Sequence, residues 1–197
     1  MFPEIARDEV FRLETRRLWL RWPRPADAPA LAALADDWRV ARHTAHIPSP
    51  YTLADAENFV RAARERNARG AAFETVATLK SGSRDLVGGF GALPACGGLE
   101  VGYWLGSPYW GLGLASEAVR ALAEAMFLFT PAGRIDARVL PVNAASRNML
   151  TRAGFRVAGE TVAEGRHAGR PAELYALPRA DWAAARRLQA ASASVTA

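Results

Sequence analysis

The chain has 197 residues, of which half are hydrophobic and 23% are charged, and its formal net charge is +5. A chain of this length fits one domain. Its composition excludes wholesale disorder, because it supplies enough apolar side chains to build a core. The single cysteine, Cys96, excludes an internal disulfide, so that a reducing, cytoplasmic setting is expected.

Other classes of protein are not favoured. The N-terminal segment has scattered charges, and no apolar run approaches about 18 residues, so we expect neither an export signal nor a membrane span. The histidines, His43, His46 and His167, have no cysteine or carboxylate at ligand spacing, which argues against a metal site. A basic chain can bind nucleic acid, but the arginines are spread along the sequence, so we expect no nucleic-acid partner.

The spacing of apolar residues predicts the elements in chain order. They are a strand over 16–22, helices over 27–38 and 52–67, strands over 71–79, 86–93 and 99–105, a helix over 115–129, a strand over 134–140, a helix over 143–153, and strands over 155–162 and 172–178. Antiparallel strands between helices predict one α+β domain over 1–187, and the residues from 188 to 197 are expected to fray.

Four boundary residues support this order. Thr52 with Asp55 forms a capping box for the second helix, Asn143 is a helix N-cap, and Gly154 is the residue that ends that helix. Within the strand over 99–105, alternation places Leu99, Val101, Tyr103 and Leu105 on one face and Glu100, Gly102 and Trp104 on the other.

The stretch GYWLGSPYWGLGLASEAV, residues 102–119, joins this strand to a helix through small residues at every second position: Gly111, Gly113 and Ala115. The first turn of a helix has unpaired N–H groups, and small residues let an anion approach them closely. The amides from about Leu112 to Ser116 are therefore a candidate pyrophosphate site. The alternative is a tight connection that holds no ligand. No lysine follows, which excludes a Walker A loop, and a dinucleotide fingerprint needs a third glycine and an early βαβ unit.

The segment LEVGYWLGSPYWGLGLASEAV resembles the central motif of GNAT-superfamily acetyltransferases, especially the RimJ/RimL-type protein N-terminal acetyltransferases. The later segment PVNAASRNMLTRAGFRVAGE, residues 141–160, resembles the Asn-x-x-Ser and Gly-Phe segment of the same family, and ETRRLWLRW and IPSPYT resemble its N-terminal part. The resemblance covers about residues 12–182. It implies a mixed, mostly antiparallel twisted sheet flanked by helices, in which the strands that hold Glu100 and Ile135 splay apart.

The resemblance also implies the co-substrate, acetyl-CoA, and the residues that bind it. Backbone near Trp104, Leu105 and Gly106 would pair with the pantetheine. The pyrophosphate would lie on the turn formed by Trp110, Gly111, Leu112, Gly113, Leu114, Ala115 and Ser116. The CoA arm would meet Asn143, Ser146 and Arg147, with Arg147 at the 3′-phosphate. For Asn143 and Arg147, simple N-capping and an exposed cation are the respective alternatives.

Acetyl transfer to an amine needs a base, because a protonated amine cannot attack the thioester. Glu100 is the first candidate base by its position in the motif, and Glu164 is the second; the alternative for each is a surface carboxylate. Ser146 is the candidate acid for the departing thiolate, with a helix serine bonded to backbone as its alternative. Many relatives use a tyrosine where this chain has Leu150. Glu117 is explained by the helix dipole rather than by catalysis.

The implied activity is transfer of an acetyl group to a primary amine by direct attack in a ternary complex, with no metal. The preferred acceptor is a protein N-terminal α-amine, as in ribosomal-protein modification. A small-molecule amine (an antibiotic, polyamine or amino-acid derivative) is the alternative acceptor, and a non-catalytic acyl-CoA-binding module is the alternative to an enzyme. A homodimer is left open, and acceptor choice is expected to depend on residues 39–53 and 164–171.

Overall fold

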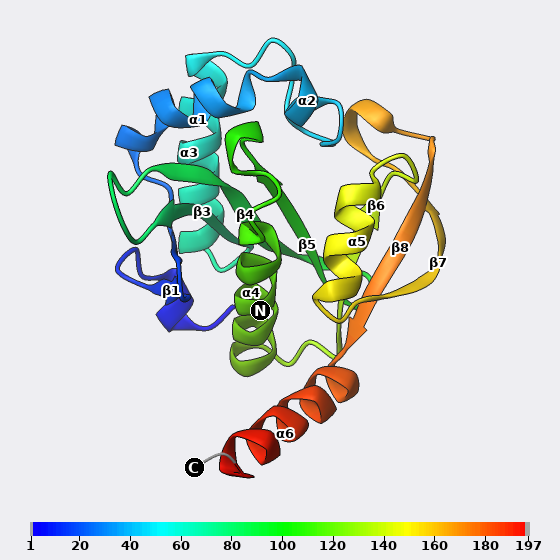
Figure 1. Ribbon diagram of the computed structural model, residues 1–197. Helices are drawn as coiled ribbons and strands as arrows, with labels where there is room; N and C mark the ends of the chain where they lie inside the picture. Colours follow the sequence, from blue (N-terminus) through cyan, green and yellow to red (C-terminus); the bar gives the residue numbers. More distant parts are fainter. Residues whose placement is uncertain (1, 196–197) are drawn as a thin grey trace.

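The computed structural model describes residues 2–195, and one eight-stranded sheet runs through it (Figure 1). The strands are β1 (Arg12–Glu14), β2 (Leu18–Arg21), β3 (Phe73–Leu79), β4 (Leu86–Ala95), β5 (Gly98–Leu105), β6 (Arg134–Val139), β7 (Arg156–Val162) and β8 (Pro171–Pro178). The α-helices are α1 (Ala28–Ala35), α2 (Trp38–Ala41), α3 (Leu53–Ala68), α4 (Leu114–Phe129), α5 (Ala144–Arg152) and α6 (Arg179–Val195). The predicted α+β class is confirmed.

The order of the strands is β1-β2-β3-β4-β5-β6-β8-β7, and every neighbouring pair is antiparallel except β5 and β6. These two parallel strands are joined only by the pairs Leu99↔Ile135 and Glu100↔Asp136, whereas β4 and β5 pair along the whole of β5. Beyond Glu100 the described part of β5 therefore has no ladder partner on its β6 side. This is the predicted splay, and it opens the sheet at its centre.

Helices cover the two faces of the sheet unequally. On one face, α4 and α5 pack over the central strands, and on the other α1 and α3 pack over β3 and β4 (Figure 1). The predicted alternation of β5 is confirmed: Leu99, Val101 and Leu105 are buried in the core beneath α4, whereas Trp104 packs against the α1 and α3 cluster. Glu100 and Trp104 therefore share the face opposite α4.

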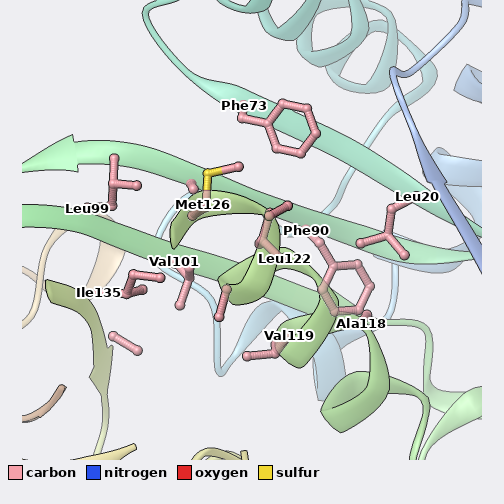
Figure 2. Packing of buried hydrophobic residues seen from close by; sticks show 14 of the residues in the cluster. Leu20, Phe73, Phe90, Leu99, Val101, Ala118, Val119, Leu122, Met126 and Ile135 are labelled. Atoms are coloured by element: carbon pink, nitrogen blue, oxygen red, sulfur yellow. The ribbon is translucent and has the colours of Figure 1, made fainter. Parts of the chain in front are cut away.

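Helix α4 supplies the centre of the larger core, because its apolar residues recur at helical spacing and point at the sheet. Val119, Leu122 and Met126 lie against side chains of β4, β5 and β6 (Figure 2). One residue of the predicted stripe differs: Phe129 is 39% exposed, because it lies in the last turn, where its ring meets Phe11 edge-on instead of entering the core.

The structure corrects the helix predicted over 27–38. It is interrupted after Ala35, where Asp36 leaves the helical region (ψ 48°) and Asp37 caps the separate helix α2 by accepting a bond from the Arg39 amide. Trp38 is consequently 59% exposed rather than aligned with the buried Leu31. Strand β1 was not predicted. At the C-terminus, helical backbone continues to Val195, past the expected domain end at 187.

The predicted helix ends are confirmed. The capping box of α3 has both of its bonds: Thr52 Oγ1 accepts from the Asp55 amide, and Asp55 accepts from the Thr52 amide. Asn143 Oδ1 accepts from the Ser146 amide at the start of α5. Gly154, with φ of 97°, follows the end of that helix in a conformation that favours glycine. Within residues 2–195, no helix has the length and apolar character needed to cross a membrane.

Candidate active site

A continuous cleft of about 1730 Å³ enters the splay between β5 and β6. It brings together most of the residues singled out from the sequence: Glu100, Trp104, Leu105, Trp110, Gly111, Gly113, Leu114, Ala115, Ser116, Asn143, Ser146 and Glu164. Gly106, Leu112 and Arg147 do not line it. The motif residues, which are far apart in the chain, thus face one volume.

The glycine turn has a backbone geometry that only glycine adopts without strain. Gly111 and Gly113 have φ of 75° and 73°, in the left-handed region, and Gly113 is the N-cap of α4. The first ladder bond of α4 is donated by the Glu117 amide to the Gly113 carbonyl, so that the amides of residues 114–116 precede the ladder. Trp110 Nε1 donates to the Leu105 carbonyl at 2.8 Å and ties the turn back to β5.

Glu117 has a structural role beside this turn. It accepts from the Thr15 hydroxyl (2.6 Å) and from the Arg17 amide and Nε (2.7 Å each). Although burial raises the pKa of Glu117, these bonds outweigh it and hold that pKa below its ordinary value. Arg17 also donates to the Leu112 carbonyl at 2.8 Å. The carboxylate therefore fixes the turn to the loop between β1 and β2.

The two candidate bases are bridged by an arginine that the sequence reasoning missed. On the face opposite α4, Arg138 of β6 donates to both oxygens of Glu100, with the shortest contact 2.6 Å from Nη2, and its Nη1 donates to Glu164. The hydrogen bonds that Arg138 donates to Glu100 and, next in effect, to Glu164 raise its pKa above the ordinary value, against the effect of burial. An acceptor amine that approaches either carboxylate must share it with this guanidinium.

A glycine, Gly102, lines the cleft on the same face of β5 as Glu100. Gly102 lies opposite Gly91 in the β4–β5 ladder, and a Cβ placed on Gly102 would have open space around it. The expected room beside Glu100 is thus present. A Cβ on Gly89 would lie 2.6 Å from Trp104 Nε1, so that glycine at 89 lets the indole lie flat on β4 as one wall of the site.

On the α4 face of the cleft, Tyr103 reaches from β5 to α5. Its hydroxyl and Ser146 Oγ are 2.7 Å apart, and its ring stacks on Phe90 with centroids 6.3 Å apart. Burial raises the pKa of Tyr103 above its ordinary value, although the Ser146 bond opposes the rise. The sequence assigned Tyr103 to the core face, and the only available signal for another role was that a tyrosine occupied an otherwise aliphatic position.

Arg147 points away from the cleft. Its Nε is 2.9 Å from a Glu173 oxygen on β8. A hydrogen bond that it donates to Tyr175 and the charge of Glu173 raise the pKa of Arg147 above its ordinary value, against the effect of burial. A smaller pocket of about 520 Å³ lies beyond Ser116 and is lined by other arginines that the sequence reasoning missed: Arg16, Arg17, Arg120 and Arg152. Positive charge thus gathers at the outer end of the glycine turn.

Two loops close the far end of the cleft, where acceptor choice was expected. Arg166 donates its amide to the Ala45 carbonyl and its guanidinium to the carbonyls of Ala41 and Ile47, which docks the loop after β7 on the segment after α2. His43 and His167 line the cleft there, and burial lowers the pKa of each, with nearby arginines adding to the effect. These surroundings favour the neutral form of both rings.

No group of three or more histidine, cysteine or carboxylate side chains suited to a metal occurs among residues 2–195. The cleft is lined by carboxylates, hydroxyl groups, imidazoles and the backbone of the glycine turn.

Comparison with known proteins shows to which family this chain is similar. A family model described as "Acetyltransferase (GNAT) domain" matches residues 17–156. The "Uncharacterized N-acetyltransferase p20" of Bacillus licheniformis is 31% identical over 151 residues, which are 75% of this chain and 83% of that protein.

Solved structures share the fold at lower identity. Mycobacterium smegmatis RimJ in complex with CoA-disulfide superposes with a TM-score of 0.74 at 23% identity, over 90% of this chain and 95% of that one. RimL, a ribosomal L7/L12 α-N-protein acetyltransferase in complex with CoA, gives 0.75 at 18% identity, over 85% and 98%. Because the family model spans well over half of the chain, the protein belongs to the GNAT family of acetyltransferases.

Proposed function

We propose that this acyltransferase binds acetyl-CoA in the β5–β6 splay and passes the acetyl group directly to a protein N-terminal α-amine. The observation that carries the proposal is the meeting of three features in one cleft: an unpaired strand edge beyond Glu100, a left-handed glycine turn at a helix N-terminus, and a carboxylate pair on the opposite face. Each suits one part of the reaction.

The donor would lie along the edge of β5. Pantetheine amides can add as a short ladder partner to the edge of β5 beyond Glu100 that has no β6 partner, next to the Leu105 carbonyl that accepts from Trp110 Nε1. The pyrophosphate would receive the amides at the start of α4, around Leu114 to Ser116, where the helix dipole favours an anion. The outer pocket with Arg120 and Arg152 suits the 3′-phosphate better than Arg147 does, because Arg147 is engaged by Glu173.

The chemical step would divide between the two faces of the sheet. Glu100, or Glu164 through a water, would take a proton from the acceptor ammonium so that the neutral amine attacks the thioester carbon. A backbone amide of the splayed part of β5 would stabilise the oxyanion. The C–S bond then breaks with its electron pair on sulfur, and Ser146 on α5 would donate a hydrogen bond to that thiolate.

The choice of a protein α-amine rests on the relatives and on the shape of the far end of the cleft. RimL is described as acting on the α-amine of a ribosomal protein. A Cβ placed on Gly102 would meet nothing within 4 Å, so there is room for an extended main chain next to Glu100. A small-molecule amine remains the alternative acceptor, and the test separates the two.

The test has two parts. Isothermal calorimetry measures acetyl-CoA binding, and absence of binding would remove the proposal at its first step. Mass spectrometry then measures acetylated product in a panel of N-terminal peptides, aminoglycosides, polyamines and amino acids. Acetylation of peptide α-amines supports the proposal. If only small amines are acetylated, the acceptor is a small-molecule amine and not a protein α-amine. Tight binding of acetyl-CoA with no turnover of any amine would indicate an acyl-CoA-binding module.

A further inference from the structure

The proposed mechanism gives a role to Ser146 but none to Tyr103, whose hydroxyl lies next to that of the serine. The two oxygens are 2.7 Å apart, and they belong to elements on opposite sides of the splay, β5 and α5. Both residues line the cleft. The bond is therefore the point at which the two walls of the proposed thioester site touch.

Both members of the pair are held in place. Phe90 stacks on the tyrosine ring from the neighbouring strand, where it is the direct ladder partner of Tyr103. The Ser146 amide donates to Asn143 Oδ1 at 3.1 Å, which fixes the first turn of α5. Neither side chain needs to rearrange for the bond to persist, so the hydroxyl groups keep one relative geometry.

The direction of the bond follows from the acidity of its two groups. A phenol is the stronger hydrogen-bond donor and an aliphatic hydroxyl is the stronger acceptor. Burial keeps the tyrosine protonated, because it raises the pKa of Tyr103 above its ordinary value. Tyr103 Oη–H is then the donor and Ser146 Oγ the acceptor, which leaves the serine hydrogen unused by this bond.

We propose that Tyr103 is a positioning residue for Ser146: by donating to Ser146 Oγ, it directs the serine hydrogen into the cleft, toward the sulfur of the departing CoA. This inference rests on the proposed function. In the step concerned, the amine nitrogen forms the new C–N bond and the C–S bond breaks with its electron pair on sulfur. The base holds the proton that the ammonium lost before the attack, and the second proton, which the nitrogen loses as the amide forms, passes through solvent to the sulfur, so that CoA leaves as the thiol. The serine stabilises the thiolate by a hydrogen bond while it forms and keeps its own proton.

The experiment compares Tyr103→Phe, Ser146→Ala and the double variant with Tyr175→Phe as matched control. Tyr175 of β8 is also a buried phenol of the larger core, but its hydroxyl donates to Glu173 and it does not line the cleft. For Tyr103→Phe we expect kcat to fall about tenfold with the acetyl-CoA Kd within about twofold of wild type, because the lost hydrogen bond acts in the transition state. Tyr175→Phe should leave both unchanged.

The double variant decides whether Tyr103 acts through the serine. If it does, Tyr103→Phe has no further effect in the Ser146→Ala background. Independent, multiplicative effects on kcat would overturn the inference, as would an unchanged kcat or a loss confined to acetyl-CoA affinity. Wild-type protein that fails to bind acetyl-CoA would instead contradict the proposed function.

A second readout covers a folding defect in Tyr103→Phe. Site-specific fluorotyrosine at 103 keeps the ring and the hydroxyl, and its more acidic hydroxyl is a stronger hydrogen-bond donor. We expect fluorotyrosine at 103 to keep kcat within about twofold of wild type, which assigns the tenfold loss in Tyr103→Phe to the missing hydroxyl. A loss as large as that of Tyr103→Phe would show that kcat follows the packing of the ring, and that result would also overturn the inference.

Discussion

The two sides of the splayed sheet are built by different means. On the α4 side, the glycine turn and the helix start present backbone groups whose positions follow from φ values and helix geometry. On the opposite side, the site is a cluster of charged side chains from β5, β6 and the loop after β7, in which Arg138 holds Glu100 and Glu164 together. The first side is a local property of one continuous segment, whereas the second exists only after the fold has assembled.

The largest effect on catalysis is expected from the charged side chains on the face opposite α4. Glu100→Gln should lower kcat by about 100-fold or more, because it removes the proposed base, while acetyl-CoA affinity stays the same. Glu124→Gln is the matched control, since Glu124 also pairs with an arginine, Arg186, but does not line the cleft. Steady-state kinetics with the best acceptor checks this. A larger loss for Glu164→Gln than for Glu100→Gln would exchange the roles of the two carboxylates.

The next largest effect is expected on acetyl-CoA affinity, from a change in the backbone of the glycine turn. Gly113→Ala should weaken acetyl-CoA binding about tenfold, because a Cβ at φ of 73° is strained and the turn relieves the strain by moving its amides. Gly82→Ala is the matched control: φ is 68°, a Cβ meets nothing within 4 Å, and the residue lies in the β3–β4 turn. Calorimetry should find that Gly82→Ala binds acetyl-CoA with unchanged affinity. Equal affinity for both variants would separate the turn from CoA binding.

A smaller effect is expected on stability. Arg138→Gln should lower the free energy of unfolding by about 1 kcal/mol, because it leaves Glu100 and Glu164 without their shared cation. Arg186→Gln provides the comparison, since its ion pair with Glu124 is about half exposed and should contribute only a few tenths of a kcal/mol. Urea unfolding followed by circular dichroism measures both. Indistinguishable midpoints would mean that Arg138 is energetically an ordinary surface arginine.

The smallest effect is expected on the stability of the folded protein at low pH. Burial, with Arg170 and Arg166, lowers the pKa of His167 in the folded protein, so that below about pH 6.5 the unfolded chain binds a proton that the folded chain does not, and stability falls as pH falls. The melting temperature should therefore drop more from about pH 7.5 to about pH 5.5 in wild type than in His167→Gln. Equal drops would show that His167 carries none of the acid sensitivity.

The same contrast explains what could be predicted from the sequence. The glycine turn, the strand faces of β5, the capping box at Thr52 and the cap at Asn143 are local, so their patterns were sufficient. Arg138 is 38 residues from Glu100 in the chain, and nothing near it distinguishes it from the other arginines. The break after Ala35 was missed because the two aspartates that cause it also occur on exposed helix faces.

The two ladder pairs that join β5 to β6 set the shape of the opening in the sheet. The strands touch at Leu99 and Glu100, and beyond these residues the two strands separate along β5 toward the glycine turn. Glu100 therefore lies at the narrow end of the opening, and the start of α4 lies at its wide end. A long donor bound along β5 would place one end next to the candidate base and leave its charged end at the mouth.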